Sequence, residues 1–455
     1  MRRCTPGDAG RRLCRFDMGK SGMEKGKSMM ILGASALQVP AIKKAKELGY
    51  KIILVDYDEN AAGFPLADVK LVVSTLDMEE VYRQALIYRP DVVITSTSDG
   101  PVRTAAYVNE KLGKRPDLSY EDSLCATIKS HMRNRLKEHR VPIPAYYAAE
   151  DFEGFRTAVE ALERHCIVKP SDNAGSRGVV LLDGGKLQQF AEKQFENGEQ
   201  RLAGSQSKQG AVEEQPDEAV LREVYEYSKG NSRNGVVMVE EIMTGPEVSV
   251  EAITVEGVTT IITITDKYIT RPPYFVEIAH SEPSCLDEEV QEQIKGVALR
   301  AIGAIGLQNG PSHTEIKVTE EGPKVVEIAA RLGGDFITSR LVPLSTGVDL
   351  VGASVVLATG EKPDLEKKWQ RGAAIHFIQG GEGIIRHLEA GEEVRSLDGV
   401  EEIVLYKSPG DRTNGTKSSN DRLGHIITAG ATPEEAMEIG KKALALIRVD
   451  IQACL

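Results

Sequence analysis

The sequence predicts a mixed α/β and α+β protein that begins with a doubly wound parallel sheet. Three observations favour this fold class. Strand-like and helix-like stretches alternate over residues 29–123, paired strands dominate the middle of the chain, and residues 366–455 combine strands with one final helix. The 455 residues suffice for about three domains and a sizeable core.

Composition narrows the range of partners. The net charge of −12 argues against nucleic acid and against an anionic membrane as the main partner. No run approaches about 18 consecutive apolar residues, so no membrane span is expected. The six cysteines are scattered without a C-x-x-C pair, which indicates reduced thiols in a cytoplasmic protein.

Residues 1–28 differ in composition from the rest of the chain. They carry eight Lys and Arg against three acids. A secretory signal needs an apolar core of about 7–15 residues, and none is present here. We therefore expect a disordered basic tail.

The region 29–123 alternates buried-strand runs with helical stretches, as parallel sheets do. Strands are expected at 30–33, 51–55, 69–73 and 91–95, and helices at 37–48 and 79–88. Asp99 and Arg103 follow the last of these strands. They are candidates for an edge that faces a substrate.

This region also resembles a dinucleotide-binding fold, in which Asp56 would hold a ribose. The glycine motif of such folds is incomplete, since its three positions read Gly33, Ser35 and Gln38. Without the second and third glycines the backbone cannot approach a pyrophosphate closely. An NAD site is therefore disfavoured, and structural support or a substrate-facing edge is the preferred interpretation.

Two lysines are candidates for binding nucleotide phosphates. Lys129 opens a helical stretch, and by itself it would be read as a surface charge. Lys169 lies in the apolar strand 166–170, which is followed by a loop containing Gly175 and Ser176 and then by another strand. Such a strand–loop–strand can fold over phosphates and donate backbone N–H groups to them. A plain surface hairpin is the alternative.

The segment 236–250 reads as a strand, a short connector and a second strand. The backbone of the connector, beside Ile242 and Met243, is suited to the edge and face of an adenine ring. Glu247 begins the second strand and could accept hydrogen bonds from ribose hydroxyls. Two strands joined by a simple Thr-Gly-Pro turn are the alternative.

The segment 314–327 reads as a β-hairpin around a Glu-Gly-Pro turn. A three-residue loop centred on Glu321 would place Glu315 directly opposite Glu327, with Cβ atoms about 5 Å apart. Like charges in this position repel, and Mg²⁺ removes the penalty because it takes carboxylate oxygens and bridges them to phosphates. A solvated hairpin with two exposed glutamates is the alternative.

In this order, these motifs resemble the ATP-grasp superfamily over most of residues 30–360. The resemblance implies that ATP lies between two α+β lobes, with a glycine–serine loop as a lid. It assigns the following residues to the nucleotide: Lys129, Lys169, Gly175, Ser176, Glu240, Glu241, Met243, Glu247 and, as a third cation at the phosphates, Lys267.

The same resemblance assigns Mg²⁺, or Mn²⁺ in its place, to Glu315 and Glu327. Many members of the superfamily carry Asn two residues after the second metal glutamate. Here that position is Ala329, so either a second Mg²⁺ is held weakly or another ligand replaces the Asn.

Two further motifs, 274–283 and 327–335, are similar to the branch of dipeptide-forming L-amino-acid ligases and carnosine-synthase-like enzymes. The resemblance places His280 and Arg331 at the reacting centre and Glu277 near the amino substrate. From the residues alone, the Arg331 guanidinium could fork onto a carboxylate or an acyl phosphate. A surface arginine and a structural histidine are the alternatives.

The implied reaction is ADP-forming ligation of a small carboxylate to an amine through an acyl phosphate. A carboxylase or carbamoyl-type enzyme working through carboxyphosphate and a non-catalytic ATP-binding regulator are the alternatives, and a homodimer is one option for the assembly. The implied regions are a tail (1–28), a pre-ATP-grasp domain (29–123), a small lobe (124–243) with a polar insertion near 196–217, a large lobe (244–365) and a C-terminal closing domain (366–455).

Overall fold

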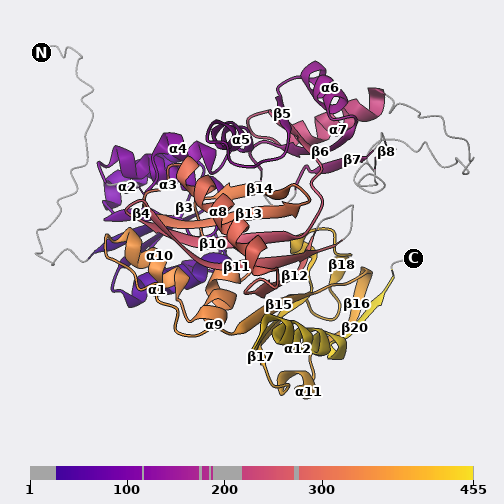
Figure 1. Cartoon of the computed structure of the whole chain (residues 1–455). Coiled ribbons are helices and arrows are strands. Elements are labelled where there is room, and N and C mark those ends of the chain that lie inside the picture. Colours follow the sequence, from indigo (N-terminus) through magenta and orange to yellow (C-terminus); the bar gives the residue numbers. More distant parts are fainter. Residues whose placement is uncertain are drawn as a thin grey trace, which may run out of the picture.

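The computed structural model describes residues 27–114, 117–173, 177–183, 186–187, 218–270 and 276–453. The predicted tail up to residue 26, the polar insertion and the Gly175–Ser176 pair lie outside these ranges. Within them, the strands form four sheets of four, five, eight and three strands (Figure 1). The mixed α/β and α+β fold class is confirmed.

The N-terminal sheet is parallel and has the order β3-β2-β1-β4. Alternate residues of β1 and β2 pack on α1 and on α2 with α3, so both faces are covered. This double coverage explains why the strands read as continuous apolar runs. The elements are β1 (Ser28–Leu32), α1 (Val39–Glu47), β2 (Lys51–Asp56), β3 (Val69–Val72), α2 (Met78–Tyr88), β4 (Val92–Ile94), α3 (Gly100–Lys111) and α4 (Tyr120–Cys125).

The small lobe is an antiparallel sheet of order β5-β9-β6-β7-β8, with α6 and α7 packed on it. Phe155 and Tyr225 anchor this packing, with ring centroids 5.4 Å apart. The lobe lies at the upper right of Figure 1, above the central sheet. Its elements are α5 (Lys129–Glu138), β5 (Tyr146–Ala149), α6 (Phe152–Ala161), β6 (His165–Pro170), β7 (Val180–Asp183), β8 (Lys186–Leu187), α7 (Glu218–Gly230) and β9 (Val237–Glu241).

The central sheet has the order β14-β13-β10-β11-β12-β15-β19-β17. Apolar residues of β10, β13 and β14 pack on α8, whereas α9 and α10 join the core that the sheet shares with the N-terminal sheet. The elements up to α10 are β10 (Glu247–Val255), β11 (Val258–Ile269), β12 (Glu277–Glu282), α8 (Glu288–Ala304), β13 (Gly310–Thr319), β14 (Gly322–Ala329), the π-helix η3 (Ile337–Leu341), α9 (Val342–Thr346) and α10 (Leu350–Ala358).

The C-terminal strands extend the same central sheet, and α12 packs on β15 and β19. The sheet therefore runs across the boundary predicted between 365 and 366, and the domain division stays a prediction. The small sheet β18-β16-β20 flanks it. The elements are β15 (Gly372–Ile378), β16 (Glu382–Glu389), α11 (Glu392–Arg395), β17 (Val400–Leu405), β18 (Arg412–Asn414), β19 (Gly424–Gly430), α12 (Pro433–Leu446) and β20 (Arg448–Gln452).

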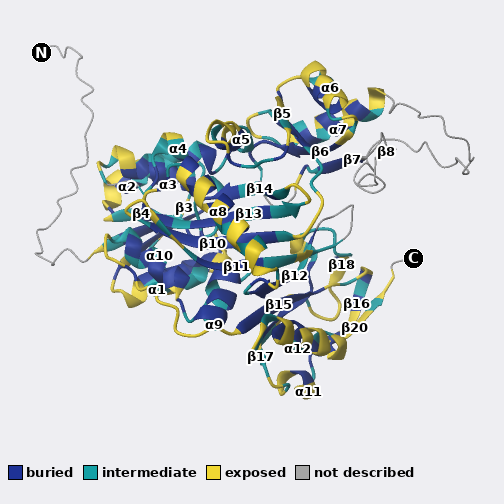
Figure 2. Ribbon diagram, in the orientation of Figure 1, coloured by how far each residue is buried: buried dark blue, intermediate teal, exposed yellow. Residues whose placement is uncertain are grey.

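Figure 2 shows buried strands at the centre and exposed faces on the outer helices. Among the described residues no single helix has the length and apolar composition to cross a membrane. Two helical segments, Ile337–Thr346 and Leu350–Ala358, together reach this length and composition, but the chain bends by 114° between them. Most residues of α10 in that pair are buried in the shared core.

The carboxyl group of Glu282 is fully buried in the central sheet. Glu282, at the end of β12, accepts hydrogen bonds from the hydroxyls of Thr265 (2.8 Å) and Ser345 (3.0 Å). Burial raises the pKa of Glu282 to about 8, although these two hydroxyls favour the charged form. The group is therefore neutral at pH 7 in the folded protein.

We expect Glu282→Gln to flatten the pH dependence of the unfolding free energy. Because the folded-state pKa of about 8 exceeds the ordinary 4.5, this group's contribution is complete below pH 4.5 and is lost as the pH rises through 8. Between pH 4.5 and 8, this group changes the unfolding free energy by at most about 1.4 kcal/mol per pH unit. Urea denaturation across this range tests the prediction, with the exposed Glu289→Gln as control. Equal slopes in wild type and Glu282→Gln would contradict it.

We also expect Gly245→Ala to destabilise the protein by more than about 1 kcal/mol. Gly245 connects β9 to β10 with φ +123°, and an added Cβ would lie 1.9 Å from the carbonyl oxygen of Val318 in β13. The matched control is Gly296→Ala in α8, where nothing lies within 4 Å and the helix should gain about 0.5–1 kcal/mol. Chemical denaturation of both variants measures the difference, and a Gly245→Ala protein as stable as wild type would refute it.

Candidate active site

The polar face of the central sheet gathers five charged side chains. Because side chains alternate along a strand, Val248, Ile316 and Val325 point to α8 while their neighbours point to the opposite face. The strand register places Glu247 of β10 opposite Lys267 of β11 on one side and opposite Lys317 of β13 on the other. The five charged residues gathered at the candidate site are Glu247, Lys267, Glu315, Lys317 and Glu327; Lys324, opposite Lys317, lies farther along the same face.

The predicted pairing of Glu315 with Glu327 is present, but the predicted loop is wrong. The turn contains two residues, Glu320 and Glu321, because Thr319 pairs with Gly322. A register shift then leaves Val326 as an extra residue in β14, and this bulge restores Glu315 opposite Glu327. Glu315 and Glu327 therefore face each other because of a bulge that the sequence pattern does not reveal.

The donor set fits a magnesium ion that also takes phosphate oxygens. Mg²⁺ in nucleotide sites is held by one or two carboxylates together with phosphates and water. Glu315 and Glu327 provide two carboxylates, with side chains 24% and 35% exposed. No group of three or more His, Cys, Asp or Glu side chains suited to a metal occurs among the described residues. The carboxylate pair is thus the candidate metal site.

Lysines neutralise both carboxylates of the pair. Lys129 Nζ lies 2.8 Å from Glu327, and Lys267 Nζ lies 2.9 Å from Glu315 and 2.7 Å from Glu247. Burial alone would lower the pKa of each lysine, but the neighbouring carboxylates outweigh it and raise both. The Lys129 ammonium also donates to the carbonyl of Asn173, at the start of the loop that the sequence assigns to phosphates.

Lys169 and Glu240 form a buried ion pair at the base of the small lobe, with Nζ 2.7 Å from Oε2. Arg133 of α5 donates two parallel hydrogen bonds to the same carboxylate, both 2.9 Å. Burial would raise the pKa of Glu240, but Arg133 and Lys169 lower it to about 2. Burial lowers the pKa of Lys169, and Glu240 offsets only part of this effect. The Glu240 side chain therefore contacts protein cations, not the β9–β10 connector.

The β9–β10 connector carries the candidate adenine contacts. The Glu241 carboxylate accepts from the N–H of Ala145 at 2.9 Å and lies 3.4 Å from Lys324. The backbone N–H and C=O of Met243 form no hydrogen bond with the described part of the chain. A donor and an acceptor are thus available side by side at the position that the sequence assigns to adenine.

Glu277, His280 and Arg331 lie in two separate clusters. Arg331 Nε donates to Asp99 at 2.6 Å, which joins β14 to the N-terminal sheet. His280 is 1% exposed, and its Nε2 lies 3.2 Å from Asp335. Glu277 is linked to the same aspartate through Arg422.

Arg422 is a site residue that the sequence analysis missed. It precedes β19 and donates two parallel hydrogen bonds to Asp335, at 2.8 and 2.9 Å, and one to Glu277 at 3.3 Å. Its guanidinium lies 3.5 Å from the centre of the Phe377 ring. Burial would raise the pKa of Asp335, but His280 and Arg422 lower it instead. The run 421–427 gave no signal of this role beyond its position in the C-terminal region.

His313 occupies the place opposite Ala329, where many relatives carry Asn two residues after the metal glutamate. Its Nδ1 lies 2.6 Å from the buried Glu251, and its Nε2 lies 3.4 Å from Glu315. Burial would lower the pKa of His313, but Glu251 outweighs it and raises the pKa to about 9. A protonated imidazole therefore adds to the cations that surround Glu315.

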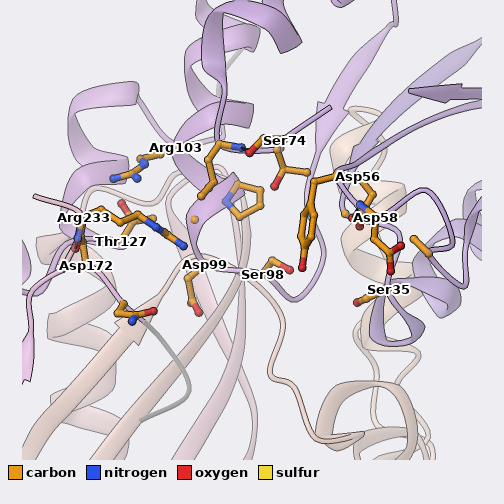
Figure 3. A pocket seen from close by; sticks show the side chains of 18 of the residues that line it. Ser35, Asp56, Asp58, Ser74, Ser98, Asp99, Arg103, Thr127, Asp172 and Arg233 are labelled. Atoms are coloured by element: carbon orange, nitrogen blue, oxygen red, sulfur yellow. Dashed lines mark hydrogen bonds between the residues drawn. The ribbon is translucent and has the colours of Figure 1, made fainter. Parts of the chain in front are cut away.

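A cavity of about 570 Å³ adjoins Glu327 and opens onto the carboxyl ends of the N-terminal strands (Figure 3). Lys129 and Glu327 line it from the side of the lobes, and Asp56, Ser98 and Arg103 line it from the side of the N-terminal sheet. The cavity thus lies at the junction of the N-terminal sheet, the small lobe and the hairpin.

Comparison with known proteins identifies two regions. A family model of the ATP-grasp domain matches residues 162–339, and one of the L-amino acid ligase C-terminal domain 2 matches residues 376–452. Among solved structures, the L-amino acid ligase from Bacillus licheniformis superposes with a TM-score of 0.73 over 94% of this chain and 100% of that chain. At 20% identity, this likeness shows a shared fold.

Curated relatives match over shorter stretches. Alanine–anticapsin ligase of Bacillus subtilis (strain 168) is 29% identical over 258 residues, which is 56% of this chain and 52% of that protein. Carnosine synthase 1 of Gallus gallus is 34% identical over 132 residues, which is 29% of this chain and 14% of that protein. The chain therefore contains an ATP-grasp domain over residues 162–339, and residues 376–452 match the C-terminal domain 2 of L-amino acid ligases.

Proposed function

We propose that this protein is an ATP-dependent, ADP-forming ligase that joins a small carboxylate, such as an amino acid, to an amine through an acyl phosphate. One observation carries the proposal. Glu315 and Glu327 face each other on the central sheet, and lysines from two other elements, Lys129 and Lys267, converge on them. Two facing carboxylates with cations around them suit a metal–triphosphate site.

The nucleotide would lie between the small lobe and the central sheet. The free backbone groups at Met243 suit the adenine edge, and Glu247 at the start of β10 suits the ribose hydroxyls. Lys129, Lys169 and Lys267 would contact phosphates, with Gly175 and Ser176 as the lid. All three lysines pair with glutamates in this structure. Phosphate oxygens would therefore replace a carboxylate as the partner of each lysine, and no unpaired ammonium group would have to lose its water.

The proposed reaction has two steps. A carboxylate oxygen of the substrate attacks the γ-phosphorus of ATP, and the bond to the β–γ bridging oxygen breaks to release ADP. The amine nitrogen then attacks the acyl carbon, and the C–O bond to phosphate breaks to release inorganic phosphate. Mg²⁺ held by Glu315 and Glu327 would neutralise charge on the transferring oxygens. Alignment by the protein alone can supply about 7–11 kcal/mol in favourable cases.

Three residues would act on the reacting groups. Arg331 uses Nε for Asp99 and Nη1 for the Leu332 carbonyl, which leaves Nη2 for an acyl phosphate oxygen. Glu277, with a side chain 26% exposed, would accept the proton from the attacking amine. His280, held by Asp335 in the cluster that also contains Glu277, would help to position the amine substrate.

A carboxylase or carbamoyl-type enzyme that forms carboxyphosphate is the second candidate, and a non-catalytic ATP-binding regulator is the third. The second shares the phosphate and metal residues, so the site does not separate it from a ligase. ADP release screened over pairs of amino acids, with and without bicarbonate, distinguishes all three. Release that needs two amino acids supports the ligase, release that needs bicarbonate supports the carboxylase, and no release under any mixture supports the regulator.

We expect Glu327→Ala to reduce ADP release by about 100-fold or more, because it removes a group that stabilises charge in the transition state. The matched control is Glu320→Ala in the exposed turn of the same hairpin, which should retain wild-type activity. The melting temperatures of both variants establish that they are folded. Near-normal ADP release by a folded Glu327→Ala protein would remove the proposed metal site.

We expect Lys169→Ala to weaken ATP binding by about tenfold or more, the range of one charge-assisted hydrogen bond. Calorimetric titration with Mg-ATP measures the dissociation constant without requiring turnover. Lys295→Ala on α8, whose lysine pairs with the neighbouring Glu292 on that helix, is the control. An unchanged dissociation constant in a folded Lys169→Ala protein would discard the phosphate assignment.

A further inference from the structure

The cavity beside the metal carboxylates lies where parallel sheets commonly bind ligands. The strand order β3-β2-β1-β4 changes direction at β1, so the crevice forms outside the carboxyl ends of β1 and β4. Gly33 and Ser35 follow β1, and Ser98 and Asp99 follow β4; all four line the cavity. A volume of about 570 Å³ falls within the range of small-molecule sites. The proposed nucleotide contacts at Met243 and Glu247 do not line this cavity.

Two arginines without an ion-pair partner among the described residues line one wall of the cavity. Arg103 comes from α3, and Arg233 comes from the segment between α7 and β9. Figure 3 shows both on the side opposite Asp56 and Asp58. Arg233 Nη1 lies 3.9 Å from the Cβ position of Gly100, so its guanidinium reaches the first turn of the helix that carries Arg103. Neither guanidinium forms an ion pair with any described carboxylate.

The acids of the cavity, by contrast, are already engaged. Asp56 accepts the N–H groups of Ala34 (2.7 Å) and Asp58 (3.0 Å). Asp172 accepts from the hydroxyl of Ser232 (3.1 Å) and from the backbone N–H of Arg233 (2.8 Å).

The remaining two acids next to the arginines have cationic partners of their own. Asp99 pairs with Arg331 at 2.6 Å, and Glu327 pairs with Lys129 at 2.8 Å. A fifth acid of the cavity, Asp58, accepts the backbone N–H of Asn60 (2.9 Å), and a third arginine, Arg177, also lines the cavity. Within the described part of the chain, Arg103 and Arg233 present unpaired guanidinium groups on one wall, and this wall favours an anion.

We propose, on the basis of the ligase function above, that one substrate carries a second anionic group, a carboxylate or a phosphate monoester, which Arg103 and Arg233 bind. The reacting end of that substrate then points to Lys129 and Glu327, which line the same cavity. Guanidinium groups bind carboxylate and phosphate oxygens through paired hydrogen bonds, which gives direction as well as charge. The substrate class is thus an amino acid or amine with an anionic side chain rather than an unsubstituted neutral one.

The test compares anionic probes with neutral partners of similar size on the full chain. L-Glutamate and O-phospho-L-serine are the anionic probes, and L-glutamine and L-serine are their neutral partners. Shift of the melting temperature with each probe alone measures binding. ADP release with Mg-ATP and each of the common amino acids as second substrate measures turnover. The glutamate arm reports a carboxylate site and the phosphoserine arm a phosphate site.

We expect at least one anionic probe to bind about tenfold or more tightly than its neutral partner, and Arg103→Gln and Arg233→Gln each to remove most of that preference. Arg300→Gln on the exposed face of α8 should retain it. Equal binding of anionic and neutral probes, or a preference that survives in the Arg103→Gln, Arg233→Gln double variant, overturns the inference. The dissociation constant of Mg-ATP, measured in every variant, reports whether the nucleotide site is intact.

The ligase function and the anion site at Arg103 and Arg233 can each be refuted without refuting the other. ADP release from neutral amino acids with no anionic preference leaves the ligase proposal standing and overturns the anion site. An arginine-dependent preference for an anionic probe, with no ADP release under any mixture, supports the anion site and overturns the ligase.

Discussion

The arrangement of the site depends on one buried arginine. Arg133, fully enclosed between α5 and the hairpin, binds the Glu240 carboxylate and also donates to the carbonyls of Val325 (3.0 Å) and Val326 (2.8 Å). A bulge leaves its extra residue out of the ladder, and an unpaired buried carbonyl is costly. Arg133 supplies the missing partner for Val326. It thereby stabilises the bulge that sets Glu315 opposite Glu327 and, through Glu240, places Lys169.

The polar face that results is built from charges that need one another. Two carboxylates directly opposite each other repel, and removing one partner of a buried ion pair typically costs about 3–5 kcal/mol. Lys267, with a side chain only 5% exposed, contacts Glu247 and Glu315 at once. Replacing a buried group of ion pairs by apolar residues is often neutral for stability, so stability alone does not explain why these charged residues are kept. A bound metal–nucleotide complex supplies both cations and anions. Its metal ion could pair with the carboxylates and its phosphates with the lysines, so no charge would be left without a partner.

Local patterns in the sequence were sufficient for the fold class, the hairpin and the polar face, because strand periodicity and turn residues act over short distances. They predicted Glu315 opposite Glu327 but not the two-residue turn or the bulge at Val326, which contacts Arg133, far away in the chain. Arg422 was missed for the same reason. Its partner Asp335 lies 87 positions earlier, and only the continuous central sheet brings the two together.

The cavity and the reacting centre share one carboxylate, and this links substrate binding to chemistry. Asp99 stands at the N-cap of α3, yet its side chain caps no helix N–H and pairs with Arg331 instead. An anion bound by Arg103, one turn into the same helix, would repel the Asp99 carboxylate and attract the Arg331 guanidinium, so it would add to the negative charge around Arg331. Arg331 would then be held in place most firmly when the substrate is present, which in the proposed reaction is when the acyl phosphate would need to be stabilised.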